Sequence, residues 1–142
     1  MRKQDYYSKD EIKRMFQFYR EKGDMNITDR EYDILCDAIR CLPKEIVNKI
    51  KEEVYFVVLS LGEGRKQYPA CYLSTYSECL KSKKGIIFLT PLIFESKPDC
   101  LYPTSEILHE VAHHVLGHME ENAKTQREAK KLAEKWILLC LG

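Results

Sequence analysis

The histidines of this chain lie in one short segment, and that segment constrains the fold more than any other feature. All four fall between His109 and His118, although the chain has 142 residues. The segment begins His109-Glu110-Val111-Ala112-His113, which is the pattern H-E-x-x-H. Residues four apart in a helix project within about 40° of each other, so a helix here would bring His109 and His113 to one metal ion. The pattern therefore predicts a helix with two metal ligands on one face.

The residue types in this pattern indicate hydrolytic chemistry. Imidazole nitrogens bind Zn²⁺ at about 2.0–2.1 Å, and catalytic zinc sites keep three protein ligands and one position for water. Glu110 follows the first histidine, where its carboxylate can reach that water and accept its proton. We therefore interpret His109 and His113 as zinc ligands and Glu110 as the general base of a metal-dependent hydrolase.

The same segment has the composition of a buried helix. We expect Thr104 to be its N-cap and the helix to run from about Ser105 to Gly117. Apolar residues occur on more than one side of it, as in a helix surrounded by other elements. These residues are Ile107, Leu108, Val111, Ala112, Val115 and Leu116. The zinc ligands would then sit on a rigid, packed element.

The other two histidines are not expected to reach the same ion. In a continuous helix His114 projects about 140° from His109, which favours a structural histidine with satisfied hydrogen bonds. His118 would lie about 180° from His109, near the helix C-terminus, where an imidazolium interacts favourably with the helix dipole.

We therefore expect the third ligand to come from the final helix, which should begin at about Gln126. Glu134 should face water, whereas Glu128 lies at the edge of the apolar stripe beside Leu132 and can turn inward. Glu128 is thus the candidate ligand. One alternative stays open, because Thr125 and Glu128 also have the spacing of a capping box, in which Glu128 would bond to the backbone.

The rest of the chain predicts an α+β fold with a helical N-terminal part and a small three-stranded sheet, antiparallel or mixed. Capping boxes at Ser8–Glu11 and Thr28–Glu31 precede two amphipathic stripes, and Pro43 suits the start of a third helix. The stripes fit core-facing helices; alternatively, they form a separate interaction module. The expected strands cover residues 54–59, 68–76 and 85–90.

Composition excludes several function classes. A formal net charge of +1 provides no field for holding nucleic acid. The longest apolar runs are far below the ~20 residues of a membrane span. The six cysteines form no C-x-x-C pair, and residues 1–10 contain no apolar targeting segment. We therefore expect a cytoplasmic protein with free thiols and with neither nucleic-acid nor membrane partners.

Two motifs carry a family resemblance. Residues 107–118 contain H-E-x-x-H-x-x-L-G-H, and residues 127–133 read Arg-Glu-Ala-Lys-Lys-Leu-Ala. Together with the expected strand at 85–90, they resemble the ImmA/IrrE family of zinc metallopeptidases. The resemblance implies a gluzincin-like fold that binds Zn²⁺ through His109, His113 and Glu128, with Glu110 as general base.

The length of the chain predicts a single domain, and the resemblance, to which residues 1–42 contribute nothing, implies a substrate class. The chain would be a single domain over residues 1–142, with a zincin-like core at 43–142 and N-terminal helices of unassigned role at 1–42. A typical substrate would be a regulatory protein, such as a repressor of a phage or mobile element. We expect an extended peptide to pair with the edge of the strand at 85–90. The alternative is a zincin-like domain that binds a partner without cleaving it.

Overall fold

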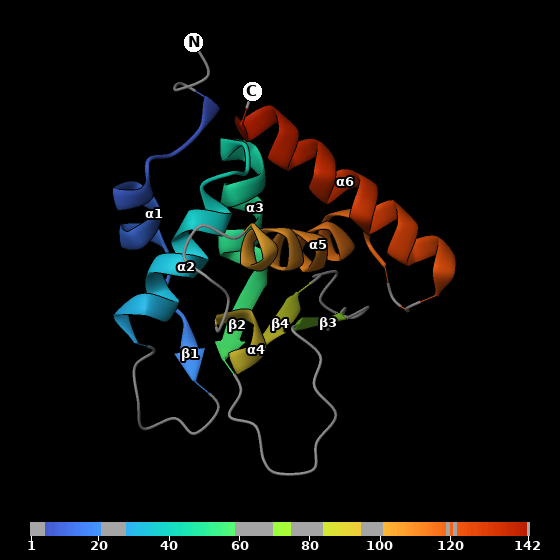
Figure 1. Ribbon diagram of the computed structural model, residues 1–142, viewed down its shortest axis with the longest axis horizontal. Coiled ribbons are helices and arrows are strands. Elements are labelled where there is room, and N and C mark those ends of the chain that lie inside the picture. Colours follow the sequence, from blue (N-terminus) through green and yellow to red (C-terminus); the bar gives the residue numbers. More distant parts are fainter. Residues whose placement is uncertain are drawn as a thin grey trace.

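The computed structural model describes residues 5–20, 28–58, 70–74, 84–94, 101–118, 120 and 122–141. In these residues helices and strands build a mixed fold, shown in Figure 1, and the predicted α+β class is confirmed. The elements are α1 Lys9–Met15, β1 Tyr19–Arg20, α2 Asp29–Ile39, α3 Lys44–Glu53, β2 Val54–Val58, β3 Ala70–Ser74, β4 Gly85–Leu89, α4 Pro91–Phe94, α5 Tyr102–Leu116 and α6 Ala123–Leu141.

The strands form one mixed sheet in the order β1-β2-β4-β3. β1 and β4 pair in parallel with β2, whereas β3 pairs antiparallel with β4. The three predicted strands correspond to β2, β3 and β4. The three-strand count is not confirmed, because the described residues also contain β1. A strand of two residues is too short to show an alternating pattern.

The expectation that the strand at 85–90 forms an edge is wrong. Leu89 of β4 pairs with Val58 on one side and with Ala70 on the other, so β4 is an inner strand. The hydrophobic pattern of a strand shows which of its faces is buried but not which strands lie beside it. In the described sheet β3 is the outer strand next to β4.

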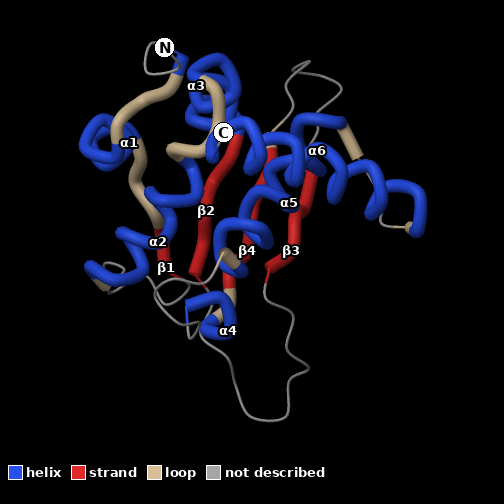
Figure 2. The backbone as a smooth tube through the Cα atoms, turned by 45° about the horizontal axis from the view of Figure 1, so that its top comes forward, coloured by secondary structure: helices blue, strands red, loops and turns tan. Residues whose placement is uncertain are grey.

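One face of the sheet is covered by helices. In β2 the side chains of Val54, Phe56 and Val58 are buried, whereas Tyr55 on the opposite face is 52% exposed. Figure 2 shows the helices on one side of the strands. α5 lies against β3 and β4, α2 packs beside α5, and α6 packs on α5. α5 is thus held between the sheet and α6.

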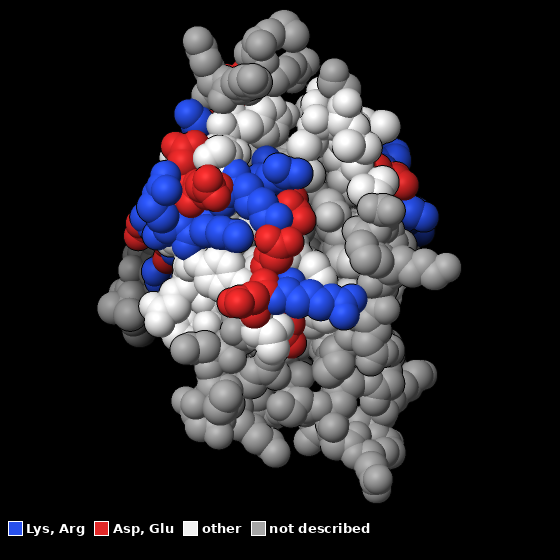
Figure 3. Space-filling view, turned by 60° about the vertical axis from the view of Figure 1, so that its left-hand side comes forward, with Lys and Arg blue, Asp and Glu red and all other residues white. Residues whose placement is uncertain are grey.

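The N-terminal helices belong to the same hydrophobic core. Both predicted capping boxes form, at Ser8 before α1 and at Thr28 before α2. Lys9 of α1 lies 2.6 Å from the Asp33 carboxylate of α2, and Figure 3 shows acidic and basic side chains intermingled on one face of the molecule. Such exposed pairs contribute about 0–1 kcal/mol each. Leu35 of α2 is fully buried in the core that α5 also lines, so apolar packing makes the larger contribution here.

No helix in the described part of the chain is both long enough and apolar enough to cross a lipid bilayer.

Gly85 leaves room for an aromatic ring that bridges β3 and α5. A Cβ atom at this position would lie 2.8 Å from the Tyr72 hydroxyl and 3.0 Å from His114 Nδ1. We predict that Gly85→Ala lowers the free energy of unfolding by about 1–3 kcal/mol, because the ring must move or the strand must shift. Urea unfolding would measure this loss. It should shrink in a Tyr72→Ala background, and an equal loss in both backgrounds would contradict the steric explanation.

Candidate metal centre

The helix that carries the H-E-x-x-H pattern starts earlier than predicted. α5 begins at Tyr102, and its N-cap is Leu101, which makes no side-chain capping bond. The prediction of Thr104 as N-cap is therefore wrong. Pro103 in the first turn explains the difference, since its fixed φ suits this position and its missing N–H is not needed there. The helix ends at Gly117, whose φ of 76° is left-handed.

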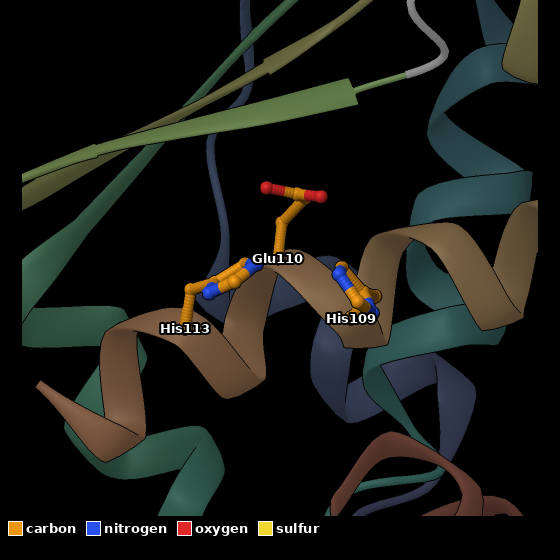
Figure 4. Close-up of side chains that lie close together, drawn as sticks. All are labelled: His109, Glu110 and His113. Atoms are coloured by element: carbon orange, nitrogen blue, oxygen red, sulfur yellow. The ribbon is translucent and has the colours of Figure 1, made fainter. Parts of the chain in front are cut away.

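The helix brings the predicted residues together. Ligand atoms of His109, Glu110 and His113 all lie within 4.8 Å of one another. In Figure 4 the carboxylate of Glu110 points toward the strands, and the two imidazoles lie beside it on α5. Glu110 is 7% exposed and His113 is 2% exposed, whereas His109 is half-buried. Of the described residues, this cluster alone has the composition and spacing of a metal site.

A third donor reaches the cluster from α6. The amide oxygen Oε1 of Gln126 lies 2.6 Å from His109 Nε2 and 3.2 Å from His113 Nε2. Sequence reasoning missed Gln126 because it searched for charged ligands and started the helix too late. The signal that could have located it is Asn122, since Asn122 and Thr125 exchange capping hydrogen bonds and start α6 at Ala123.

Glu128, the ligand predicted from the sequence, does not lie in this cluster. Its Oε1 lies 2.9 Å from His118 Nε2, and His118 Nδ1 lies 2.9 Å from His113 Nδ1. The reason is helical geometry, since Gln126 and Glu128 are two residues apart and project about 200° from each other. The alternative capping role of Glu128 is not observed either, because Thr125 caps with Asn122 instead.

His118 lies directly after the C-terminus of α5, as predicted, and it is not part of the His109, Glu110 and His113 cluster. The separation of about 180° from His109 applied only to a continuous helix; the left-handed Gly117 ends α5, and His118 Nδ1 lies 2.9 Å from His113 Nδ1. The result is a row of polar contacts from Glu128 through His118 to His113.

The electrostatic setting favours a metal-binding form of His113. Burial, and after it the charge of the neighbouring His109, together lower the pKa of His113 from 6.5 to about 4. The ring is therefore neutral near pH 7, as a metal ligand must be.

The donor set fits zinc. Two imidazole nitrogens and an oxygen are donors that Zn²⁺ accepts. Ligand bonds of about 2.0–2.2 Å in tetrahedral geometry separate two donors by about 3.3 Å. The 3.2 Å between Gln126 Oε1 and His113 Nε2 matches this separation. The 2.6 Å contact to His109 would have to widen by about 0.7 Å, which an amide side chain allows.

The prediction of His114 as a structural histidine is confirmed. The ring is fully buried. Its Nδ1 lies 2.7 Å from the Tyr72 hydroxyl, and its Nε2 lies 2.7 Å from Oε1 of Glu53. These contacts join α5 to β3 and to the end of α3.

Glu134 is exposed, as predicted.

The contact between Glu53 and His114 makes the stability of the folded state depend on pH. Burial raises the pKa of the Glu53 carboxyl, but hydrogen bonds from His114 and Lys49 outweigh it, and the pKa lies below its ordinary value of 4.5. A carboxyl with a lowered pKa stabilises the folded state above its ordinary pKa and loses that contribution as the pH falls through its folded pKa.

We therefore predict that Glu53→Gln lowers the free energy of unfolding by about 1 kcal/mol at pH 7, the difference between a charged and a neutral hydrogen bond. The gap between the two proteins should narrow as the pH falls below 4.5. Urea titrations over a descending pH series would measure it, and a gap that stays constant would contradict a role for the charge.

No protein-family model, curated protein or solved structure shows a significant match to this chain. The ImmA/IrrE resemblance of the motif residues therefore stays a prediction.

Proposed function

We propose that this protein is a zinc-dependent metallopeptidase in which His109 and His113 hold Zn²⁺ and Glu110 is the general base. The observation that carries this proposal is the buried Glu110 carboxylate next to two imidazoles on one helix. A carboxylate seldom lies in an apolar interior without a specific role, because its burial is unfavourable. The motif resemblance to a metallopeptidase family supports the same reaction class.

The two histidines and Glu110 would have different roles in peptide hydrolysis. A bound zinc ion would acidify a water molecule and polarise the scissile carbonyl. Glu110 accepts a proton from the attacking water and later delivers it to the leaving amine. Because α5 is packed between the sheet and α6, its imidazoles and its carboxylate keep their relative positions during these proton transfers.

The proposed substrate is an extended segment of a protein. β3 is the outer strand of the described sheet and lies against α5, the helix that carries the cluster. Main-chain groups of such a strand can pair with an extended peptide and bring its carbonyls to the site. By the family resemblance, the substrate would be a regulatory protein of the cytoplasm, such as a transcriptional repressor.

One observation favours a second candidate function, a partner-binding domain without catalysis. The donor that α6 brings to the imidazoles is the neutral amide of Gln126, not a carboxylate. A neutral donor holds a divalent cation less firmly than a charged one. The protein would then recognise the same extended segment without cleaving it.

We predict that Glu110→Gln keeps the zinc content of the wild type and lowers peptide cleavage by about 10²–10⁴-fold, the usual contribution of a general base. Zinc would be counted by elemental analysis. Cleavage would be followed by mass spectrometry, first on a peptide library and then on any repressor encoded beside this chain.

The matched control is Glu134→Gln, the same change at an exposed glutamate of α6. It should leave both zinc content and cleavage unaltered. Zinc-independent binding of a target that the wild type leaves intact would overturn the peptidase proposal and support the partner-binding domain.

A further inference from the structure

We infer that Gln126 is the third protein ligand of this site and that Glu128 acts one step further out, as a positioning residue that orients His113 through His118. This inference rests on the proposed zinc site and names the residues that complete it. The sequence motif suggests Glu128 as the ligand from α6, whereas this inference assigns that role to Gln126.

The contacts of Gln126 support its role as ligand. One oxygen atom lies within hydrogen-bond distance of Nε2 of both His109 and His113. These two nitrogens belong to the cluster whose donor atoms can surround one ion. A group that already touches both imidazoles needs only a small shift to bind the same cation.

The packing of α6 keeps Glu128 away from that position. Ala129 and Ala133 are buried, at 0% and 3% exposure, on the side of α6 that faces the core. Gln126 projects within about 60° of both, whereas Glu128 projects about 100–140° from them. Turning Glu128 to the imidazoles would withdraw the two alanines from the core.

The contacts of Glu128 form a directed chain of hydrogen bonds. For His113 to bind a metal through Nε2, its proton must sit on Nδ1, which then donates to His118 Nδ1. The proton of His118 is then on Nε2, which donates to the Glu128 carboxylate. A carboxylate that fixes the tautomer and orientation of a ligating histidine is a common companion of metal sites. In this chain the imidazole of His118 lies between the Glu128 carboxylate and His113.

The experiment measures zinc affinity by competition with a chromophoric chelator, for the full chain and its variants. Gln126→Ala should weaken zinc binding by about 100-fold, because a ligand is lost, and Gln126→Glu should tighten it by about tenfold, because the new donor is charged. Glu128→Gln should weaken it by about tenfold, and the exposed control Glu134→Gln should have no effect. Circular dichroism of each variant checks that it is folded.

A double-mutant cycle tests the path through His118. In a His118→Phe background, Glu128→Gln should cause no further loss of zinc affinity, because the connection to His113 is already broken. A direct ligand would lose its contribution in either background. The inference is overturned if Gln126→Ala and Gln126→Glu both bind zinc like the wild type, or if Glu128→Gln is equally damaging with and without His118.

The outcomes separate this inference from the proposed function. Zinc binding with the expected order of variants, but no cleavage of any peptide, would overturn only the peptidase activity. Cleavage with zinc held through Glu128 would overturn only the ligand assignment. A wild-type chain that does not bind zinc would overturn both.

Discussion

The packing of α6 on α5 is the interaction on which the site depends. α5 supplies two imidazoles and a carboxylate, but two imidazoles alone hold a metal weakly. The third donor comes from α6, and the buried alanines at 129 and 133 determine which side of α6 faces the cluster. A shift of one residue along α6 would rotate its side chains by about 100° and replace Gln126 by a neighbour. The chemistry of the site is therefore determined by apolar contacts that take no part in it.

Adjacent histidines give α5 its orientation toward its two neighbours. His113 contacts Gln126 of α6, whereas His114, about 100° further around the helix, contacts Tyr72 of β3 and Glu53 at the end of α3. The Tyr72 and Glu53 contacts of His114 resist rotation of the helix about its axis, because each is a 2.7 Å hydrogen bond to a fully buried ring. A buried polar group left without its partner would be unfavourable by about 1–3 kcal/mol. One histidine thus anchors the helix so that the preceding one can keep its position in the site.

The sequence was sufficient for most features that are decided locally. The capping boxes at Ser8 and Thr28, the strand segments and the helical spacing of His109, Glu110 and His113 depend on residues a few positions apart, and the structure contains them where the patterns predict. The start of α5 is an exception, because Pro103 lies in its first turn and Thr104 is not its N-cap. Features that depend on how distant elements meet were predicted less well. The inner position of β4 depends on strand order, and the choice between Gln126 and Glu128 depends on the first turn of α6. The contact of His118 with His113 belongs to the same group, because it depends on the left-handed Gly117 that ends α5.

A neutral third donor also changes the charge balance of the proposed site. Two imidazoles and an amide leave both charges of a divalent ion uncompensated by its ligands, and within the cluster the one carboxylate belongs to Glu110. The attraction between that ion and Glu110 would be strong in a buried, low-dielectric place. This attraction would also draw Glu110 toward the attacking water. An anionic third ligand would weaken the attraction, because it would neutralise part of the charge of the ion. The Glu128 carboxylate lies further out, beyond His118, so it can orient His113 without neutralising the ion. In the proposed peptidase, the neutral amide on α6 would leave Glu110 as the carboxylate of the cluster that faces the ion.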